Sequence, residues 1–311
     1  MSSQDKGGVR LETVSADQAG QRLDNFLARH LKGVPRSMVY RLIRTGQVRI
    51  NGGRCKPSRR LECGDVVRIP PARTAQRDEI VVPERAVELL RERVLYRDDD
   101  LLVIDKPSGM AVRAGSGLAW GVIDVLRQIE PGAYVELAHR LDRETSGCLV
   151  LARNGAALKV LSAQFREGRV DKRYLCLLHG RLAEAVVEVD APLARVAAQG
   201  GERAVEVVPE GKPARTRFRL LEAYRDASYV EAELLTGRTH QIRAHARHLG
   251  MPLAGDGKYA SRESARHWRS LGLKRIFLHA HALEIEGADG ESQHFSCPLP
   301  DELRKVLDRS L

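Results

Sequence analysis

The chain has 311 residues, 43% hydrophobic and 30% charged, so it is long enough for two domains and has the composition of a globular protein. No apolar stretch approaches the roughly 18 residues that cross a bilayer, and the first residues lack the apolar core of a signal peptide, which predicts a cytoplasmic protein without a membrane partner. The net charge of +10 indicates a polyanionic partner.

The positive charge is concentrated near the N-terminus. Residues 22–77 contain 14 Lys or Arg and three acidic residues, which gives +11 and leaves the remainder of the chain close to neutral. Surfaces that bind nothing usually mix both signs of charge. This segment is therefore expected to bind RNA, although a solvated basic surface is the alternative.

The N-terminal region predicts a small ααββ domain over residues 19–70. Residues 1–18 are polar and are expected to form a flexible tail. Apolar residues at helical spacing predict a helix from residue 22 to 31 and a second helix that begins near Ser37, its expected N-cap, and stops at Gly46. Residues 48–51 predict a strand that runs into an Asn-Gly turn, and residues 65–70 predict a second strand.

Residues 71–84 contain prolines and charges without a clear period and are expected to be a linker. The second domain, residues 85–311, begins with a strand, an acidic turn and another strand, and continues with helices over 121–129, 156–166 and 240–249. Apolar runs at 148–152 and 172–180 predict buried strands, and residues 181–235 predict a meander of strands at 186–189, 204–208, 214–223 and 229–235. The fold class expected from these elements is α+β, with a largely antiparallel sheet and flanking helices.

The densest cluster of polar residues is His-Arg-Leu-Asp-Arg-Glu-Thr-Ser-Gly at residues 139–147. Asp142 stands between Arg140 and Arg143, and cationic neighbours would keep a carboxylate ionised even in a largely dry site. An ionised carboxylate suits a nucleophile or a base. From these residues alone, a cap of a turn before the next strand is the favoured explanation of the aspartate.

Residues 139–147 closely resemble the H-R-L-D-x-x-T-S-G signature of the RluA-type pseudouridine synthases, with every fixed position matched. Residues 106–109 resemble the family's K-P-x-G motif, residues 172–174 its K-x-Y motif and residues 236–245 its T-G-R-x-H-Q-I/L-R-x-H motif. The resemblance implies that Asp142 is the catalytic residue, that Tyr174 lies under the target base, and that Arg243 pairs with Asp142. Arg140 would contact RNA or assist base flipping. Taken alone, the 106–109 motif predicts only a turn with a surface lysine.

The N-terminal domain resembles the small alpha-L RNA-binding module first known from a ribosomal protein, through R-L-D-x-F-L, G-x-V-x-I-N-G and G-D-x-V. With this module joined to the catalytic motifs, the chain is most similar to the RluC subgroup. The resemblance implies a catalytic domain with a mixed sheet that isomerises uridine to pseudouridine in large-subunit ribosomal RNA. No cofactor is expected, because an isomerisation involves no redox change, and the chain is expected to be a monomer without a metal. The expected RNA-binding residues of the N-terminal domain are Arg36, Arg41, Arg44, Arg54 and Lys56.

Three alternatives follow from the same residues. A noncatalytic RNA-binding protein could retain this fold, and a nucleoside hydrolase or glycosidase could use Asp142, although hydrolytic sites generally employ two carboxylates. A zinc site could use His240, His245 and His248, but no carboxylate or cysteine nearby completes it. The five cysteines are scattered without a Cys-x-x-Cys pair, so neither a disulfide framework nor a cysteine zinc site is expected.

Overall fold

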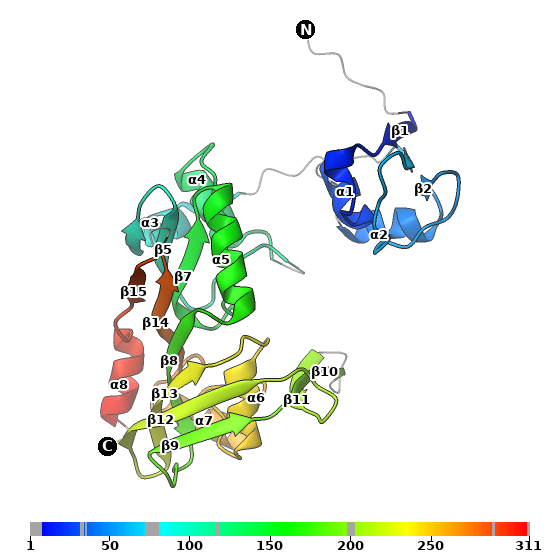
Figure 1. The fold of residues 1–311 in the computed structure, drawn as a ribbon. Coiled ribbons are helices and arrows are strands. Elements are labelled where there is room, and N and C mark those ends of the chain that lie inside the picture. The colour runs from blue at the N-terminus through cyan, green and yellow to red at the C-terminus, as the bar shows by residue number, and fades with distance from the viewer. Residues whose placement is uncertain are drawn as a thin grey trace. The chain divides into compact units, whose positions relative to one another are not determined.

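The computed structural model describes residues 8–31, 34, 36–71, 81–115, 118–197, 203–287 and 290–309. The chain divides into two compact units, Met1–Ile80 and Val81–Leu311 (Figure 1). The expected linker, residues 71–84, spans this division, and residues 72–80 of it lie outside the described part. The two units are described separately below.

The N-terminal unit contains the two predicted helices and the predicted hairpin. Helices α1 (Leu23–His30) and α2 (Arg36–Arg44) precede strands β2 (Arg49–Ile50) and β3 (Val66–Ile69), which pair antiparallel. The apolar faces of both helices pack on the strands in one core. The buried side chains of that core include Leu23, Phe26, Leu27, Val39, Leu42, Ile43, Val48 and Val67.

Two local predictions for this unit are wrong. Strand β1 (Arg10–Thr13) pairs antiparallel with β3, and a 3₁₀ turn, η1 (Ala16–Gln18), follows it, so residues 10–18 are not a flexible tail. The side chains of β1 are mostly exposed, which leaves no apolar alternation to detect, because backbone hydrogen bonds to β3 hold this edge strand. Helix α2 begins at Arg36, so Ser37 lies inside the helix instead of capping it.

The second unit is built on one large sheet with the strand order β4-β5-β7-β14-β8-β13-β12-β9, with β15 paired to β14 and β6 to β7 (Figure 1). Only the β7–β14 pair is parallel among the described strand pairs of this sheet. The expected mixed, largely antiparallel sheet is therefore confirmed. The strands are β4 (Val94–Arg97), β5 (Leu101–Lys106), β6 (Glu136–Leu137), β7 (Ser146–Ala152), β8 (Asp171–His179), β9 (Val186–Asp190), β12 (Arg215–Ala223), β13 (Ala227–Leu234), β14 (Leu278–Glu286) and β15 (Ser292–Ser296).

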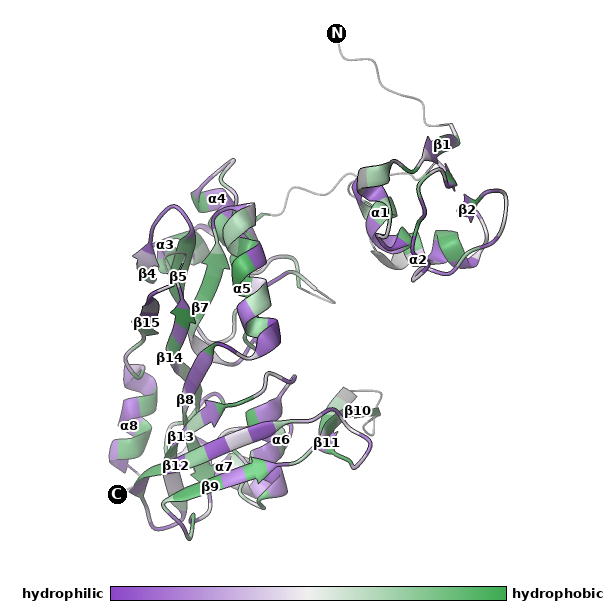
Figure 2. Cartoon of the chain, in the orientation of Figure 1, coloured by the Kyte–Doolittle hydropathy of each residue, from purple (hydrophilic) through white to green (hydrophobic). Residues whose placement is uncertain are grey.

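Helices flank this sheet at several places. Helix α5 (Gly155–Glu167) packs Leu161 against β5, β7 and β14, and Figure 2 shows β7 as a mostly hydrophobic strand. Helices α7 (Arg262–Ser270) and α8 (Asp301–Arg309) pack Trp268 and Leu303 around β8. The other helices are α3 (Glu84–Arg91), α4 (Val122–Ile129) and α6 (Gln241–His248). None of the described helices is both long and apolar enough to cross a membrane.

The predicted meander differs from the structure at one point. Strands β10 (Leu193–Ala197) and β11 (Arg203–Val207) pair with each other as a separate antiparallel hairpin and do not join the large sheet. The sequence predicted β11 but not β10, and helix α3 was also not predicted. The hairpin packs Leu193 and Val205 against Ala244 of α6, so its stability comes from a contact between segments distant in the sequence.

Gly147 allows β7 and β14 to approach each other. It lies opposite Ala280 in the parallel register, and its φ of 111° belongs to the region that favours glycine. A Cβ at this position would overlap the backbone of Ala280. The glycine of the 139–147 motif is therefore required by the packing of two buried strands.

We expect Gly147→Ala to lower the free energy of unfolding by about 3 kcal/mol or more, because it combines backbone strain with a steric overlap that no side-chain motion relieves. Urea unfolding of the full chain measures this loss. Gly155→Ala is the matched control, since a Cβ there meets nothing within 4 Å, and it should leave stability unchanged or slightly higher. Equal stability of the two variants would contradict this account of Gly147.

Candidate active site

A pocket of about 320 Å³ lies in the second unit, where the 139–147 loop, β8 and the start of α6 meet. All three predicted catalytic residues, Asp142, Tyr174 and Arg243, line it, and so does Arg140. Asp142 carries the only carboxylate among the pocket-lining residues that the structure describes. The other lining side chains include Leu141, Phe165, Lys172, Leu234, His240, Ile242 and Leu278.

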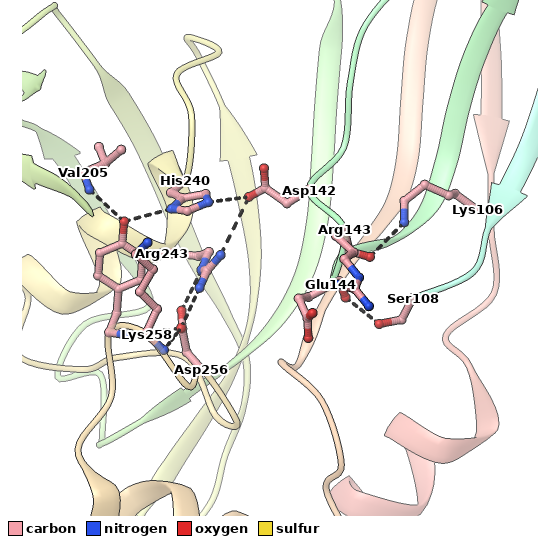
Figure 3. Close-up of polar contacts among 11 residues, drawn as sticks. Lys106, Ser108, Asp142, Arg143, Glu144, Val205, His240, Arg243, Asp256 and Lys258 are labelled. Atoms are coloured by element: carbon pink, nitrogen blue, oxygen red, sulfur yellow. Dashed lines mark hydrogen bonds and ion pairs between the residues drawn. The ribbon is translucent and has the colours of Figure 1, made fainter. Parts of the chain in front are cut away.

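Asp142 lies in the loop between β6 and β7, with about a quarter of its side chain (23%) exposed. Its Oδ2 atom lies 3.6 Å from Nε2 of His240 and 4.0 Å from Nη1 of Arg243 (Figure 3). The sequence also allowed Asp142 to be the cap of a turn. That turn is present, but it is closed by the backbone, because Thr145 N–H donates to the main-chain carbonyl of Asp142 at 3.1 Å. The carboxylate is therefore available to the pocket.

Arg243 has a closer partner than the one expected from the sequence. Its Nε and Nη2 donate to the two carboxylate oxygens of Asp256 at 2.8 and 2.7 Å, and the Asp256 side chain is completely buried. Burial alone would lower the pKa of Arg243, but the hydrogen bonds and charge of Asp256 outweigh it and raise that pKa. The expected contact with Asp142 is present only as the longer 4.0 Å ion pair.

Asp256 was missed as a site residue, because Gly255-Asp256-Gly257 has the composition of a turn. The turn is real: Asp256 Oδ1 also accepts the backbone N–H groups of Lys258 at 2.9 Å and Tyr259 at 3.1 Å. One buried carboxylate thus fixes both this loop and the Arg243 guanidinium. The sequence contains no periodic signal for such a pairing.

His240, weighed above only as a zinc ligand, is the residue closest to the Asp142 carboxylate in the described ion pairs. It precedes α6 with a φ of 53°, an uncommon conformation for a residue other than glycine. Burial lowers the pKa of its imidazole, with the Asp142 charge acting in the opposite direction. His245, the second histidine of that alternative, uses both ring nitrogens, at 2.9 Å from Thr216 Oγ1 and 3.0 Å from the Ala191 carbonyl.

Tyr174 lies on β8 with 8% of its surface exposed and lines the pocket. Burial raises the pKa of its phenol, and the negative charge of Asp142 adds to this effect. The side chain is therefore neutral and offers an aromatic face. Lys172, two residues earlier on the same strand, lines the same pocket, as the alternation of side chains along a strand requires.

His139 holds the start of the 139–147 motif in place. Its Nε2 accepts the backbone N–H of Val150 at 2.9 Å, and its ring stacks on Phe165 with 4.5 Å between the centroids. Burial lowers the pKa of the imidazole to about 3, so the ring is neutral. These contacts tie the loop that carries Asp142 to β7 and α5.

The 106–109 motif holds the other end of that loop. Lys106 is completely buried, not at the surface as the sequence suggested. Its Nζ donates to two carbonyls of its own loop and to the Arg143 carbonyl at 3.2 Å, while Ser108 Oγ donates to the Glu144 carbonyl at 2.7 Å (Figure 3). Burial lowers the pKa of Lys106 to about 7. Because three carbonyls converge on this amine, the lysine connects two motifs that are distant in the sequence.

The basic residues expected to bind RNA lie on the N-terminal unit, apart from the exposed Arg140 of the pocket. Arg41 and Arg44 are exposed on α2, whereas Arg54 and Lys56 line a shallow pocket of about 380 Å³. Arg36 begins α2, but its side chain lies outside the described residues. The expected RNA-binding residues whose side chains are described are therefore all solvent-accessible cations.

Comparisons with known proteins define the class. The family model described as RNA pseudouridylate synthase matches residues 100–248, and the S4 domain model matches residues 21–67. A Yersinia pestis protein named ribosomal large subunit pseudouridine synthase C is 48% identical over 303 residues, which cover 96% of this chain and 95% of that protein. The protein of the same name from Escherichia coli K12 is 47% identical over 307 residues, 97% of this chain and 96% of that one.

Solved structures agree with this class. The structure of human RNA pseudouridylate synthase domain containing 1 is 31% identical, with a TM-score of 0.59, and covers 68% of this chain and 84% of that one. Human RNA pseudouridylate synthase domain containing 4, at 24% identity, a TM-score of 0.61 and coverage of 72% and 95%, supports the fold. The second unit thus has the fold of an isomerase that acts on RNA, and it follows an N-terminal S4 domain in the sequence. The chain belongs to the RNA pseudouridylate synthase family.

We expect Asp256→Asn to destabilise the chain by about 3 kcal/mol or more, because it leaves the buried Arg243 guanidinium without its counter-charge. Pseudouridine formation should fall as well, since Arg243 would no longer be held near Asp142. Thermal unfolding and initial rates measure the two effects. Asp226→Asn, a change at an exposed aspartate of the same unit, should alter neither, and the prediction fails if the two variants behave alike.

Proposed function

We propose that this enzyme converts specific uridines of large-subunit ribosomal RNA to pseudouridine. The observation that carries the proposal is a pocket in which one carboxylate, Asp142, lies with an aromatic side chain, Tyr174, and a paired cation, Arg243. The names of the full-length relatives support ribosomal RNA as the substrate. Because that RNA is made and assembled in the cytoplasm of bacteria, we also propose a cytoplasmic location, with a single chain as the active form.

In the proposed reaction the uracil is detached from the sugar, rotated within the pocket, and rejoined through carbon 5. Asp142 begins the cleavage, either as a nucleophile or as a base, and both roles require the ionised form. Arg243 stabilises that form and fixes its direction through a charge-assisted contact that tightens when the substrate is bound. No redox change occurs, so the proposal includes no cofactor and no metal.

Tyr174 is proposed to stack on the detached uracil. Its neutral ring offers a flat apolar surface on which the base can turn without leaving the pocket. Ile242 and Leu278 line the same pocket and would exclude water from the intermediate.

The target base must leave its stack before it can reach Asp142, at a cost of a few kcal/mol. We propose that phosphate contacts offset this cost. Arg140, exposed beside Asp142 at the pocket, is placed to contact the flipped nucleotide. Arg36, Arg41, Arg44, Arg54 and Lys56 of the S4 domain would hold the surrounding RNA.

The described pocket argues against the hydrolytic alternative. Glycosidases position a second carboxylate at about 5 to 10 Å from the first, whereas Asp142 is the only acid among the described residues that line the pocket. The neighbouring Asp256 is completely buried and held by Arg243. A noncatalytic RNA-binding role would not require a carboxylate held by Arg243 and His240. Isomerisation is therefore the reaction that this set of side chains supports best.

We expect Asp142→Asn to abolish pseudouridine formation in unmodified large-subunit ribosomal RNA, with a loss of more than about 1,000-fold, because an amide neither attacks nor accepts a proton. Chemical mapping of pseudouridine along the RNA measures this loss. Glu144→Gln, an exposed change in the same loop, should stay within about twofold of the wild type. Free uracil as the product would favour hydrolysis, and a fully active Asp142→Asn would refute the assignment.

We expect the S4 domain to supply much of the salt dependence of RNA binding. Replacing Arg41, Arg44, Arg54 and Lys56 by alanine should reduce the slope of log K against log salt by about 3, since each lost phosphate contact removes about 0.7 to 0.9. Filter binding across a range of salt concentrations measures the slope. The matched control replaces four exposed cations of α3 and α8, namely Arg85, Arg91, Arg304 and Lys305. Equal slopes for the two variants would contradict the assignment.

A further inference from the structure

A series of polar contacts connects β11 with Asp142 through Tyr259 and His240. The backbone N–H of Val205, on β11, donates to the Tyr259 hydroxyl at 3.0 Å. That hydroxyl lies 2.9 Å from Nδ1 of His240, and Nε2 of the same ring lies 3.6 Å from Oδ2 of Asp142 (Figure 3). Four segments that are distant in the sequence are thus linked in a series that ends at one carboxylate oxygen.

The donors and acceptors in this series of contacts select one tautomer of the His240 imidazole. The Tyr259 oxygen already accepts the Val205 N–H, and a phenol has a single hydrogen to donate. Its neighbour at 2.9 Å is Nδ1 of His240, so the phenol hydrogen is directed there and Nδ1 accepts it. A neutral imidazole with an accepting Nδ1 carries its hydrogen on Nε2, which is the atom that faces Asp142.

The opposite tautomer is disfavoured at both ends of the ring. It would place two N–H donors on the Tyr259 oxygen and leave the phenol hydrogen without this acceptor. It would also turn the lone pair of Nε2 toward the Asp142 carboxylate. Burial lowers the pKa of His240 and raises that of Tyr259, so both groups are neutral and the choice is between tautomers alone.

The backbone of His240 shows that this position is constrained. A φ of 53° costs about 1 kcal/mol or more for a residue with a side chain, and such strain concentrates at functional sites. The ring of His240 also contacts that of Tyr259 edge to face, with 5.7 Å between the centroids. The structure thus maintains an unfavourable backbone conformation that directs the imidazole between Tyr259 and Asp142.

We propose that Tyr259 and His240 are positioning residues of the reaction: Tyr259 fixes the Nε2–H tautomer of His240, and this N–H turns its positive end toward Oδ2 of Asp142 at 3.6 Å, a separation slightly longer than a hydrogen bond. Arg243 Nη1 approaches the same oxygen, so Oδ1 is the atom left to react with the flipped uridine. A neutral N–H directs the carboxylate without adding a second full positive charge, which would make the carboxylate less basic. The inference rests on the proposed role of Asp142.

The tautomer is measured directly by nitrogen NMR of the full chain labelled with ¹⁵N-histidine. The wild type should show His240 with its hydrogen on Nε2 alone. Tyr259→Phe keeps the aromatic ring, over which Cζ of Arg243 lies at 5.0 Å from the centroid, and should give a mixture of tautomers. A wild type with the hydrogen on Nδ1, or an unchanged signal in Tyr259→Phe, would overturn the inference. This measurement requires no activity, so it decides the tautomer even if the wild type makes no pseudouridine, a result that would refute only the proposed function.

A double-mutant cycle tests the consequence for the reaction. Tyr259→Phe should lower kcat about tenfold, the value of one well-placed hydrogen bond, and leave KM for RNA unchanged. His240→Gln supplies an amide N–H to Asp142 that needs no tautomer, so adding Tyr259→Phe to it should cause no further loss. An equal loss from Tyr259→Phe in both backgrounds would show that Tyr259 acts independently of His240 and would overturn the inference.

Discussion

The guanidinium of Arg243, almost buried between the carboxylates of Asp142 and Asp256, provides the interaction on which the geometry of the candidate site depends. A buried cation is tolerated only when it is paired and hydrogen-bonded, and Asp256 meets both requirements with two short contacts. The pair leaves Nη1 directed toward Asp142 at 4.0 Å. This separation matters because a carboxylate held in a full bidentate pair is a poor nucleophile and a poor base. Asp256 therefore neutralises and fixes the cation, and Asp142 receives from Arg243 only the longer ion pair that the proposed reaction requires.

Three aromatic rings of the site are neutral because they are buried, although cations such as Arg140 and Lys172 also line the pocket. Burial disfavours the charged forms of Tyr174, His139 and His240, and each of these rings contributes shape and hydrogen bonding without adding charge. The cations that can attract RNA are instead exposed, at the pocket and on the S4 domain. The exposed cations can thus attract a polyanion, while the buried rings around Asp142 shape the pocket without adding charge.

The sequence predicted what local patterns encode. Apolar runs located β7 and β8, helical spacing located α4 and α5, and the order of polar residues in residues 139–147 pointed to Asp142. Contacts created by tertiary folding had no such pattern. Asp256 belongs to a turn of ordinary composition, and Tyr259 could be recognised as a site residue only after β11 and His240 were seen to contact its hydroxyl. Lys106 was expected at the surface since nothing in its neighbourhood reveals three converging carbonyls. Strand β1 was missed because backbone hydrogen bonds, which carry no side-chain signature, hold it.

The position of β14 also limits how early during synthesis the large sheet can form. In the strand order, β14 lies between β7, which follows the loop of Asp142, and β8, which carries Tyr174. Yet β14 spans Leu278–Glu286 and follows every proposed catalytic residue along the chain. A nascent chain that has already emerged past Arg243 therefore contains all the proposed catalytic residues but lacks the strand that lies between β7 and β8. Translation must be nearly finished before β14 can join the sheet and complete the walls of the pocket that Asp142 lines.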